Sequence, residues 1–225
     1  MSLLKEQTDK RQNDEKILSV AKQPKALLVL AHGAGADMNH DFMQEVALLL
    51  NNEGVNVLRF NFPYMVKRGV DGKRRPPDRM PKLLECFMSV LSSIESKLPI
   101  FIGGKSMGGR VAATLLNETI SQENFTKIRG GICLGYPFHP QKKPDKLRLE
   151  PLQLTQKKVL IVQGERDALG SKEEIADYQL STYCQLHFLA DGDHNLKPRV
   201  KSGFTHQQHI HTSIKSIVSF IDENS

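Results

Sequence analysis

Cysteine is scarce in this chain of 225 residues, which holds only Cys86, Cys133 and Cys184. Their odd number and wide spacing argue against a disulfide framework, and the lack of a Cys-x-x-Cys pair argues against a zinc cluster. A chain of this length can bury a full core without either device. Sparse cysteine favours a reducing compartment, so we expect a cytoplasmic protein.

Long apolar runs are also missing. No stretch reaches the roughly 18 consecutive apolar residues of a transmembrane helix, so we expect no membrane partner. Residues 1–22 mix acids and bases without an apolar segment, which argues against a secretory signal. With 39% hydrophobic and 25% charged residues, the composition fits one globular domain at 15–225 behind a flexible tail at 1–14.

An extended basic surface is missing as well, although the formal net charge is +6. Segment 67–79 alone contributes +4 of this charge, from six Lys or Arg residues against two Asp. A nucleic-acid-binding protein usually has a longer basic face or a recognition motif, so we expect no nucleic-acid partner. Two interpretations of segment 67–79 stay open: a loop that attracts an anionic ligand, or a solvated basic loop.

Short apolar runs alternate with amphipathic stretches along the chain. Apolar residues recur at helical spacing in 42–50, 80–94 and 210–221. The alternation predicts an α/β fold: a doubly wound, mostly parallel sheet of about six to seven strands with helices on both faces. We expect Lys16–Val20 to add an edge strand. The buried parallel strands are predicted in the runs rich in Val, Ile and Leu: Ala26–Ala31, Val55–Phe60, Ile100–Gly103, Gly131–Tyr136, Val159–Gln163 and Cys184–Leu189.

Two proline-bearing segments, 62–79 and 137–156, are longer than the other connections, and we predict both to be loops. Long loops in a compact α/β domain often carry functional residues. Neither segment is long enough to form a separate cap domain.

The strongest catalytic signal is the turn Gly103-Gly104-Lys105-Ser106-Met107-Gly108-Gly109, which contains a Gly-x-Ser-x-Gly pattern between a predicted strand and a predicted helix. Glycines two positions before and after the serine are needed because side chains would clash in so tight a turn. Such a turn exposes the Ser106 hydroxyl at the carboxyl edge of the sheet. The alternative is a glycine-rich turn that only packs a helix on a strand. A phosphate-binding loop is a weaker interpretation, because the segment lacks the GxxxxGK[ST] pattern of such loops.

A serine nucleophile needs a base, and the base needs a carboxylate to orient it. In this architecture the chain order is serine, acid, histidine. Asp167 and His194 each follow a predicted strand in that order, at the edge where parallel sheets bind ligands. We predict Ser106, Asp167 and His194 as a catalytic triad.

Other acids stay open as alternatives. Glu165 lies two residues before Asp167, which could itself be a turn residue or a helix cap. Asp191 and Asp193 lie close to His194, and a neighbour on the same loop usually cannot turn its carboxylate behind the imidazole.

Three further histidines, His206, His209 and His211, fall on the predicted C-terminal helix. The spacing of the first two suits a metal, but no Cys, Asp or Glu nearby completes a ligand set. We interpret the cluster as a solvated helix face and predict no metal site. His32 and His139 both follow predicted strands, which makes them candidates for the catalytic site.

The segment 31–36 directly follows the first buried strand and consists of small residues around His32. Small residues let a backbone approach a ligand closely. We predict that the N–H groups of Ala34 and Met107 form an oxyanion hole, although an ordinary strand-to-helix turn would look the same. Losing one such donor typically costs about 2.7–4 kcal/mol of transition-state stabilisation.

These features together resemble the α/β-hydrolase superfamily over 24–222. More narrowly, the chain resembles a small, cap-less, dienelactone-hydrolase-like group of hydrolases related to testis-expressed protein 30 and to a subunit of a chromatin acetyltransferase complex. True dienelactone hydrolases use a cysteine nucleophile, whereas this chain has Ser106. The narrower resemblance rests on five segments: 32–38, 61–64, 75–77, 104–109 and 134–140.

We therefore expect hydrolysis of a small, possibly anionic, ester or thioester through an acyl-enzyme, without a cofactor. A non-catalytic scaffold on the same fold is the alternative, and acyl transfer or peptide hydrolysis would change only the chemistry. Arginines of the basic segment could bind a carboxylate or phosphate of the substrate. The oligomeric state stays open. The predicted substrate contacts are His32, Tyr64, Arg74, Arg75, Phe138 and His139.

Overall fold

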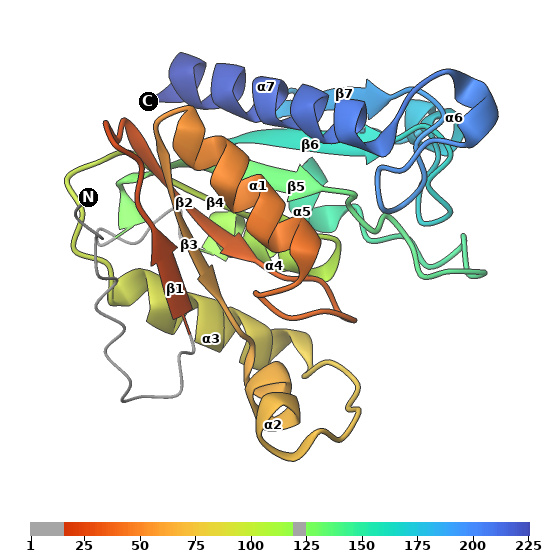
Figure 1. Ribbon diagram of the computed structural model, residues 1–225. Helices are drawn as coiled ribbons and strands as arrows, with labels where there is room; N and C mark the ends of the chain where they lie inside the picture. Colours follow the sequence, from red (N-terminus) through yellow and green to blue (C-terminus); the bar gives the residue numbers. More distant parts are fainter. Residues whose placement is uncertain (1–15, 119–124) are drawn as a thin grey trace, which may run out of the picture.

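The computed structural model describes residues 16–118 and 125–225, so the predicted tail at 1–14 lies outside the described residues. A seven-stranded sheet runs through the described chain in the order β1-β3-β2-β4-β5-β6-β7 (Figure 1). Strands β2 to β7 are parallel, and the predicted edge strand β1 pairs antiparallel with β3. The α/β prediction is confirmed. The strands are β1 Lys16–Ser19, β2 Ala26–Ala31, β3 Val55–Phe60, β4 Ile100–Lys105, β5 Ile128–Leu134, β6 Lys158–Gly164 and β7 Cys184–Leu189.

Helices cover both faces of the sheet. Figure 1 shows α1 and α7 on one face and α3 and α4 on the other. A short 3-10 turn, Val200–Ser202, precedes the C-terminal helix. The helices are α1 Asp41–Asn52, α2 Pro63–Asp71, α3 Met80–Ser92, α4 Met107–Glu118, α5 Glu150–Gln153, α6 Lys172–Ala176 and α7 His206–Asn224.

Two apolar cores result, because successive strand residues point to opposite faces. On β4, Phe101 packs with α1 and α7, whereas Ile102 packs with α3 and α4. Phe101 is fully buried and its ring lies 5.9 Å from that of Phe220 on α7. The inner strands β2 to β6 are thus buried on both sides along most of their length, as their apolar runs predicted.

Phe101→Ala should lower the free energy of unfolding by about 3–5 kcal/mol, because it removes a fully buried ring from the central strand and leaves a cavity. Chemical denaturation would measure this change. Leu48→Ala on α1 is the control, since Leu48 is 63% exposed and should shift stability by less than about 0.5 kcal/mol. Equal effects of the two substitutions would contradict this assignment of the core.

The prediction of an uninterrupted loop at 62–79 is wrong, because residues 63–71 form α2. Pro63 occupies the first turn, where its missing N–H is harmless, and Tyr64 and Met65 are the residues of the helix that are buried. Gly72 ends the helix in the left-handed conformation, at φ 69°. The second long segment contains only the single turn α5, so no large cap covers the described sheet.

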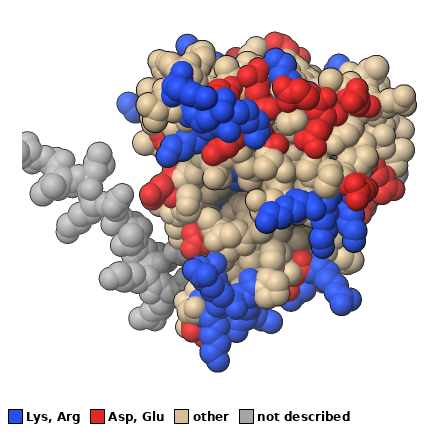
Figure 2. Space-filling model, turned by 90° about the vertical axis from the view of Figure 1, so that its right-hand side faces the viewer, with Lys and Arg blue, Asp and Glu red and all other residues tan. Residues whose placement is uncertain are grey.

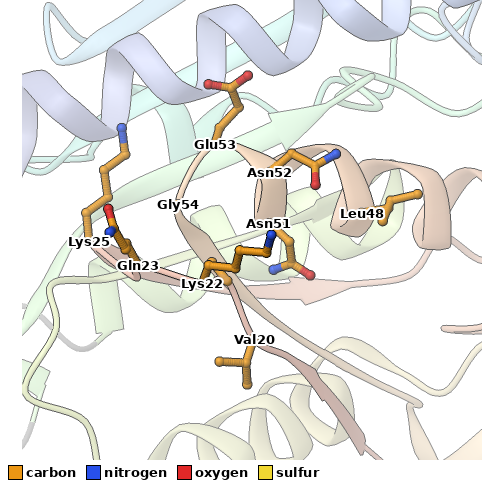
Figure 3. A pocket seen from close by; sticks show the side chains of 10 residues that line it. Val20, Lys22, Gln23, Lys25, Leu48, Asn51, Asn52, Glu53 and Gly54 are labelled. Atoms are coloured by element: carbon orange, nitrogen blue, oxygen red, sulfur yellow. The ribbon is translucent and has the colours of Figure 1, made fainter. Parts of the chain in front are cut away.

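No described helix has the combination of length and apolar character needed to cross a membrane. A hollow of about 740 Å³ lies at the amino ends of β2 and β3, opposite the edge where the catalytic residues are predicted. Lys22, Lys25 and Glu53 stand around it (Figure 3). This hollow contains none of the predicted site residues.

Candidate active site

Ser106 occupies the turn between β4 and α4, with a φ of 52°. Such a left-handed backbone costs a non-glycine residue about 1–3 kcal/mol. A hydrogen bond of 2.9 Å from the Ser106 N–H to the Leu134 carbonyl helps to hold it. A Cβ atom on Gly104 would lie 2.5 Å from the carbonyl carbon of Gly108, and one on Gly108 would lie 2.5 Å from the Ala31 oxygen. Both glycines are therefore required by close backbone approach.

The structure brings together the three residues of the predicted triad. His194 Nε2 lies 2.8 Å from Ser106 Oγ, and His194 Nδ1 lies 2.8 Å from Asp167 Oδ2. The three residues come from different loops, after β4, β6 and β7. An unbroken chain of hydrogen bonds thus runs from a buried carboxylate through an imidazole to a hydroxyl group.

Asp167 is fully buried and its carboxylate accepts hydrogen bonds at both oxygens. Besides His194, Oδ2 accepts a bond of 2.9 Å from Gln163 Nε2, and Oδ1 accepts one of 2.8 Å from the Leu169 N–H. Gln163 also donates to the carbonyl of Gly170, at 3.0 Å. These bonds fix the carboxylate behind the imidazole.

The rival acids bind other groups. Glu165 pairs with Lys172, at 2.8 Å. Asp191 pairs with both Arg166 and Arg199. Asp193 accepts backbone N–H groups of its own loop, from Asn195 and Lys197.

Lys105, which the sequence analysis missed, supports the histidine loop. Its Nζ donates a hydrogen bond of 2.6 Å to the carbonyl of His194. Burial lowers the pKa of Lys105 to about 8, and the charges of Asp167 and Asp193 oppose that shift. A Cβ atom on Gly135 would lie 2.9 Å from both Lys105 Nζ and the His194 oxygen. The only sequence signal was a cationic residue inside the nucleophile turn.

The loop that carries Ala34 is held from beneath by two predicted site residues. The Tyr64 hydroxyl donates to the Ala34 carbonyl at 3.0 Å, and His32 Nδ1 lies 2.7 Å from the Gly33 carbonyl. Burial lowers the pKa of His32 to about 4, so its ring is neutral near pH 7. Within residues 16–118 and 125–225, the N–H groups of Ala34 and Met107 have no acceptor. Both groups are therefore available to a bound molecule.

Two clefts meet at Ser106, and both include Ala34. The first, of about 410 Å³, continues over Met107, Arg110 and Arg148; we call it the arginine cleft. The second, of about 510 Å³, includes His194, and we call it the histidine cleft. Figure 2 looks onto this edge of the sheet, where the surface is hollowed and Lys and Arg side chains stand around the hollow.

The six predicted substrate contacts line neither cleft. His32, Tyr64, Phe138 and His139 are all at most 3% exposed. Phe138 packs against Tyr136, with ring centres 4.9 Å apart, and His139 lies 3.3 Å from Glu174. These four are structural supports, because each is enclosed by other side chains. 

The two remaining predicted contacts belong to the basic segment. Arg75 forms an ion pair with Asp71 on α2, and Arg74 is exposed to solvent. Neither residue lines either of the two clefts that contain Ser106.

The prediction of a solvated histidine face on α7 is wrong for His209. That residue is 3% exposed, and its Nδ1 lies 2.9 Å from the Leu196 carbonyl. The hydrogen bond holds the loop after His194 against the helix. Among the described residues, no three His, Cys, Asp or Glu side chains gather in a metal-binding arrangement.

Comparison with solved structures supports the same architecture. An alpha-beta serine hydrolase homologue from Coxiella burnetii is 19% identical, with a TM-score of 0.62 over 93% of this chain and 90% of that chain. A dienelactone hydrolase from Anabaena variabilis is 16% identical, with a TM-score of 0.66 over 93% and 91%. Est1E from Butyrivibrio proteoclasticus, solved with bound ferulic acid, is 18% identical, with a TM-score of 0.67 over 93% and 94%.

At these identities the likeness establishes the fold. The relation to testis-expressed protein 30 stays a prediction. The family itself follows from the sequence match, since residues 24–222 match the alpha/beta hydrolase domain family. This range includes Ser106, Asp167 and His194. The chain therefore belongs to the alpha/beta hydrolase family.

Proposed function

We propose that the protein is a serine hydrolase that cleaves a small ester or thioester through an acyl-enzyme. The observation that carries this proposal is the hydrogen-bonded chain from Asp167 through His194 to Ser106, at 2.8 Å on each side of the imidazole. A general base must lie within hydrogen-bond distance of the proton that it removes, and His194 Nε2 meets this requirement.

In the first step, Ser106 Oγ attacks the carbonyl carbon while His194 takes the hydroxyl proton. The negative charge that develops on the carbonyl oxygen is bound by the N–H groups of Ala34 and Met107. The intermediate then collapses, the bond to the leaving group breaks, and His194 donates its proton to that group. Asp167 orients the imidazole and stabilises its protonated form.

In the second step, water attacks the acyl-enzyme. His194 removes a proton from the water, and the same backbone donors bind the oxyanion. Collapse of this intermediate breaks the bond to Ser106 Oγ, which recovers its proton from His194 and releases the acid. In both steps the catalytic groups are side chains and backbone groups of this chain, and the second step consumes one water molecule.

The two clefts divide the substrate between them. His194 must reach the leaving-group oxygen or sulfur to protonate it, and His194 lines only the histidine cleft. The leaving group therefore belongs in the histidine cleft. The acyl group then extends into the arginine cleft, which includes the apolar side chains of Met80, Leu83 and Met107.

The proposal is tested by intact mass after treatment with a fluorophosphonate probe. We expect a single adduct on the wild-type chain and none on Ser106→Ala or His194→Ala, because the probe needs an activated serine. Folded wild-type protein that forms no adduct would contradict the proposal and favour a scaffold role. An adduct that persists in Ser106→Ala would place the nucleophile elsewhere.

Lys105→Met should lower kcat by about 10- to 100-fold with little change in KM, because a small displacement of the base slows proton transfer. The bond from Lys105 to the His194 carbonyl holds the loop that carries the imidazole. Steady-state kinetics on a p-nitrophenyl ester would measure both constants. Lys215→Met on α7 is the control, since Lys215 is exposed. An effect on KM alone would contradict a positioning role for Lys105.

A further inference from the structure

Two arginines from distant parts of the chain meet in the arginine cleft. Arg110 lies in the first turn of α4, and Arg148 lies in the segment between β5 and α5. Both line the cleft that contains Ser106, Ala34 and Met107. Neither arginine was singled out by the sequence, because 37 intervening residues separate them.

Neither guanidinium has a partner among the residues that the structure describes. Within the described part of the chain, no carboxylate forms an ion pair with Arg110 or Arg148, and no side chain or carbonyl accepts a hydrogen bond from either guanidinium. Arg110 Nε is buried and lacks an acceptor. A buried charged donor without an acceptor is costly, so a ligand that supplies an acceptor at Arg110 would gain binding free energy.

The two positive charges also act on each other. Burial lowers the pKa of Arg148, and the charge of Arg110 lowers it further. The backbone of Arg148 is fixed despite this repulsion, because its N–H donates to the Phe138 carbonyl at 2.7 Å and its carbonyl accepts from the Tyr136 hydroxyl at 2.8 Å. The fold thus holds two like charges together beside the catalytic serine.

One acid also lines the arginine cleft, and it is already bound. Asp78 accepts from Lys82 Nζ and from the Tyr64 N–H, both at 2.9 Å. Its charge is therefore matched by Lys82, which leaves the charges of Arg110 and Arg148 unbalanced. An anion entering the cleft would meet net positive charge.

The position of Arg110 sets the length of the group that it can reach. Its N–H donates to the Ser106 carbonyl at 3.1 Å, so it lies one helical turn beyond the nucleophile. Four residues of α-helix rise about 6 Å, and helical side chains lean back toward the N-terminus. An acyl group with a short chain can therefore place a terminal anion at Arg110 while its carbonyl lies at Ser106.

We propose that Arg110 and Arg148 together bind a carboxylate at the far end of the acyl group. The preferred substrates are then esters or thioesters of short dicarboxylic acids in which one carboxyl group is free. This specificity rests on the proposed serine-hydrolase function and extends it, because it assigns the acyl group and its charge. Arginine suits this role, since its planar guanidinium binds a carboxylate through two parallel hydrogen bonds.

The test compares two substrates that differ only in charge: the mono-p-nitrophenyl ester of glutaric acid and the same ester with its free carboxyl group methylated. Arg148→Gln and Arg110→Gln should each lower kcat/KM for the charged ester by about 10- to 100-fold, which corresponds to a lost charge-assisted hydrogen bond. For the methylated ester, each change should be less than about threefold. Lys146→Gln is the matched control, because Lys146 is exposed on the same segment as Arg148.

A second measurement separates this proposal from the catalytic one. Ser106→Ala should bind monomethyl glutarate in calorimetry, and the double variant with Arg148→Gln should bind it at least about tenfold more weakly. Equal binding by the two variants would overturn the anion site, whether or not the chain hydrolyses esters. An equal loss of kcat/KM on the charged and the methylated ester would overturn the anion site as well. So would a loss of kcat/KM for the charged ester in Arg74→Gln without such a loss in Arg148→Gln. Failure of fluorophosphonate labelling, with the binding difference intact, would instead overturn the proposed hydrolase.

Discussion

Ser106→Ala should lower kcat on any ester substrate by about 10⁴-fold or more and leave the fold intact. Removing a triad nucleophile leaves only the rate that the oxyanion donors and substrate binding supply. The hydroxyl is held at 2.8 Å from the base, so no other group of the turn can replace it. Steady-state kinetics with a p-nitrophenyl ester would measure the loss, and thermal unfolding would report on the fold.

Stability should change little in this variant, because alanine and serine meet a similar cost at the left-handed φ of 52°. Ser219→Ala is the control for handling and concentration, since Ser219 is exposed on α7. If Ser106→Ala kept more than about a tenth of the wild-type rate, another group would be the nucleophile and the proposed mechanism would be wrong.

The nucleophile turn could be predicted from the sequence because its geometry leaves few choices of residue. Side chains at Gly104 and Gly108 would meet backbone atoms at 2.5 Å. Such close approach makes glycine at both positions a strong local signal. The inner parallel strands were equally predictable, since β2 to β6 are buried along most of their length and are therefore rich in apolar residues. In both cases the physical cause of the structure lies within a short stretch of chain, so the local sequence is enough to predict it.

The helix α2 could not be predicted from its own residues. Only Tyr64 and Met65 are buried in it, which is too few to produce a helical apolar stripe, and Gly69 within the helix disfavours the conformation. The burial of His209 was hidden for a related reason. Its partner is the Leu196 carbonyl, in a different loop, so an isolated helix pattern could not distinguish it from a solvated residue.

The charged residues that line the clefts could not be predicted from the sequence either, because their surroundings form only when the chain folds. The basic segment 67–79 drew attention to Arg74 and Arg75, yet Arg75 is neutralised by Asp71, the last residue of α2. Arg110 and Arg148 carry no local signal, and only the folded chain shows that they share a cleft in which no described carboxylate forms an ion pair with either one. A count of charges along the sequence therefore located positive charge without showing which charges are unpaired.

Asp167→Asn should lower kcat by about 10³- to 10⁴-fold, and it should also destabilise the fold by about 1–3 kcal/mol. The carboxylate accepts from His194 and Gln163 at one oxygen and from Leu169 at the other. An asparagine amide must place its NH₂ group at one of these positions. If it replaces Oδ2, it faces the Gln163 donor, and His194 Nδ1 must become the acceptor. His194 Nε2 then carries the proton and cannot take another from Ser106.

If the amide instead turns its NH₂ group toward Leu169, two buried donors oppose each other, which produces the loss of stability. Kinetics and chemical denaturation on the same preparation would measure both effects. Glu165→Gln is the matched control, because Glu165 is the rival acid and lies paired with Lys172 at the surface. A large loss of rate in Glu165→Gln, with Asp167→Asn active, would exchange the two assignments. Loss of stability without loss of rate would make Asp167 a structural residue, since orientation of the base and integrity of the loop are the two roles that its three hydrogen bonds allow.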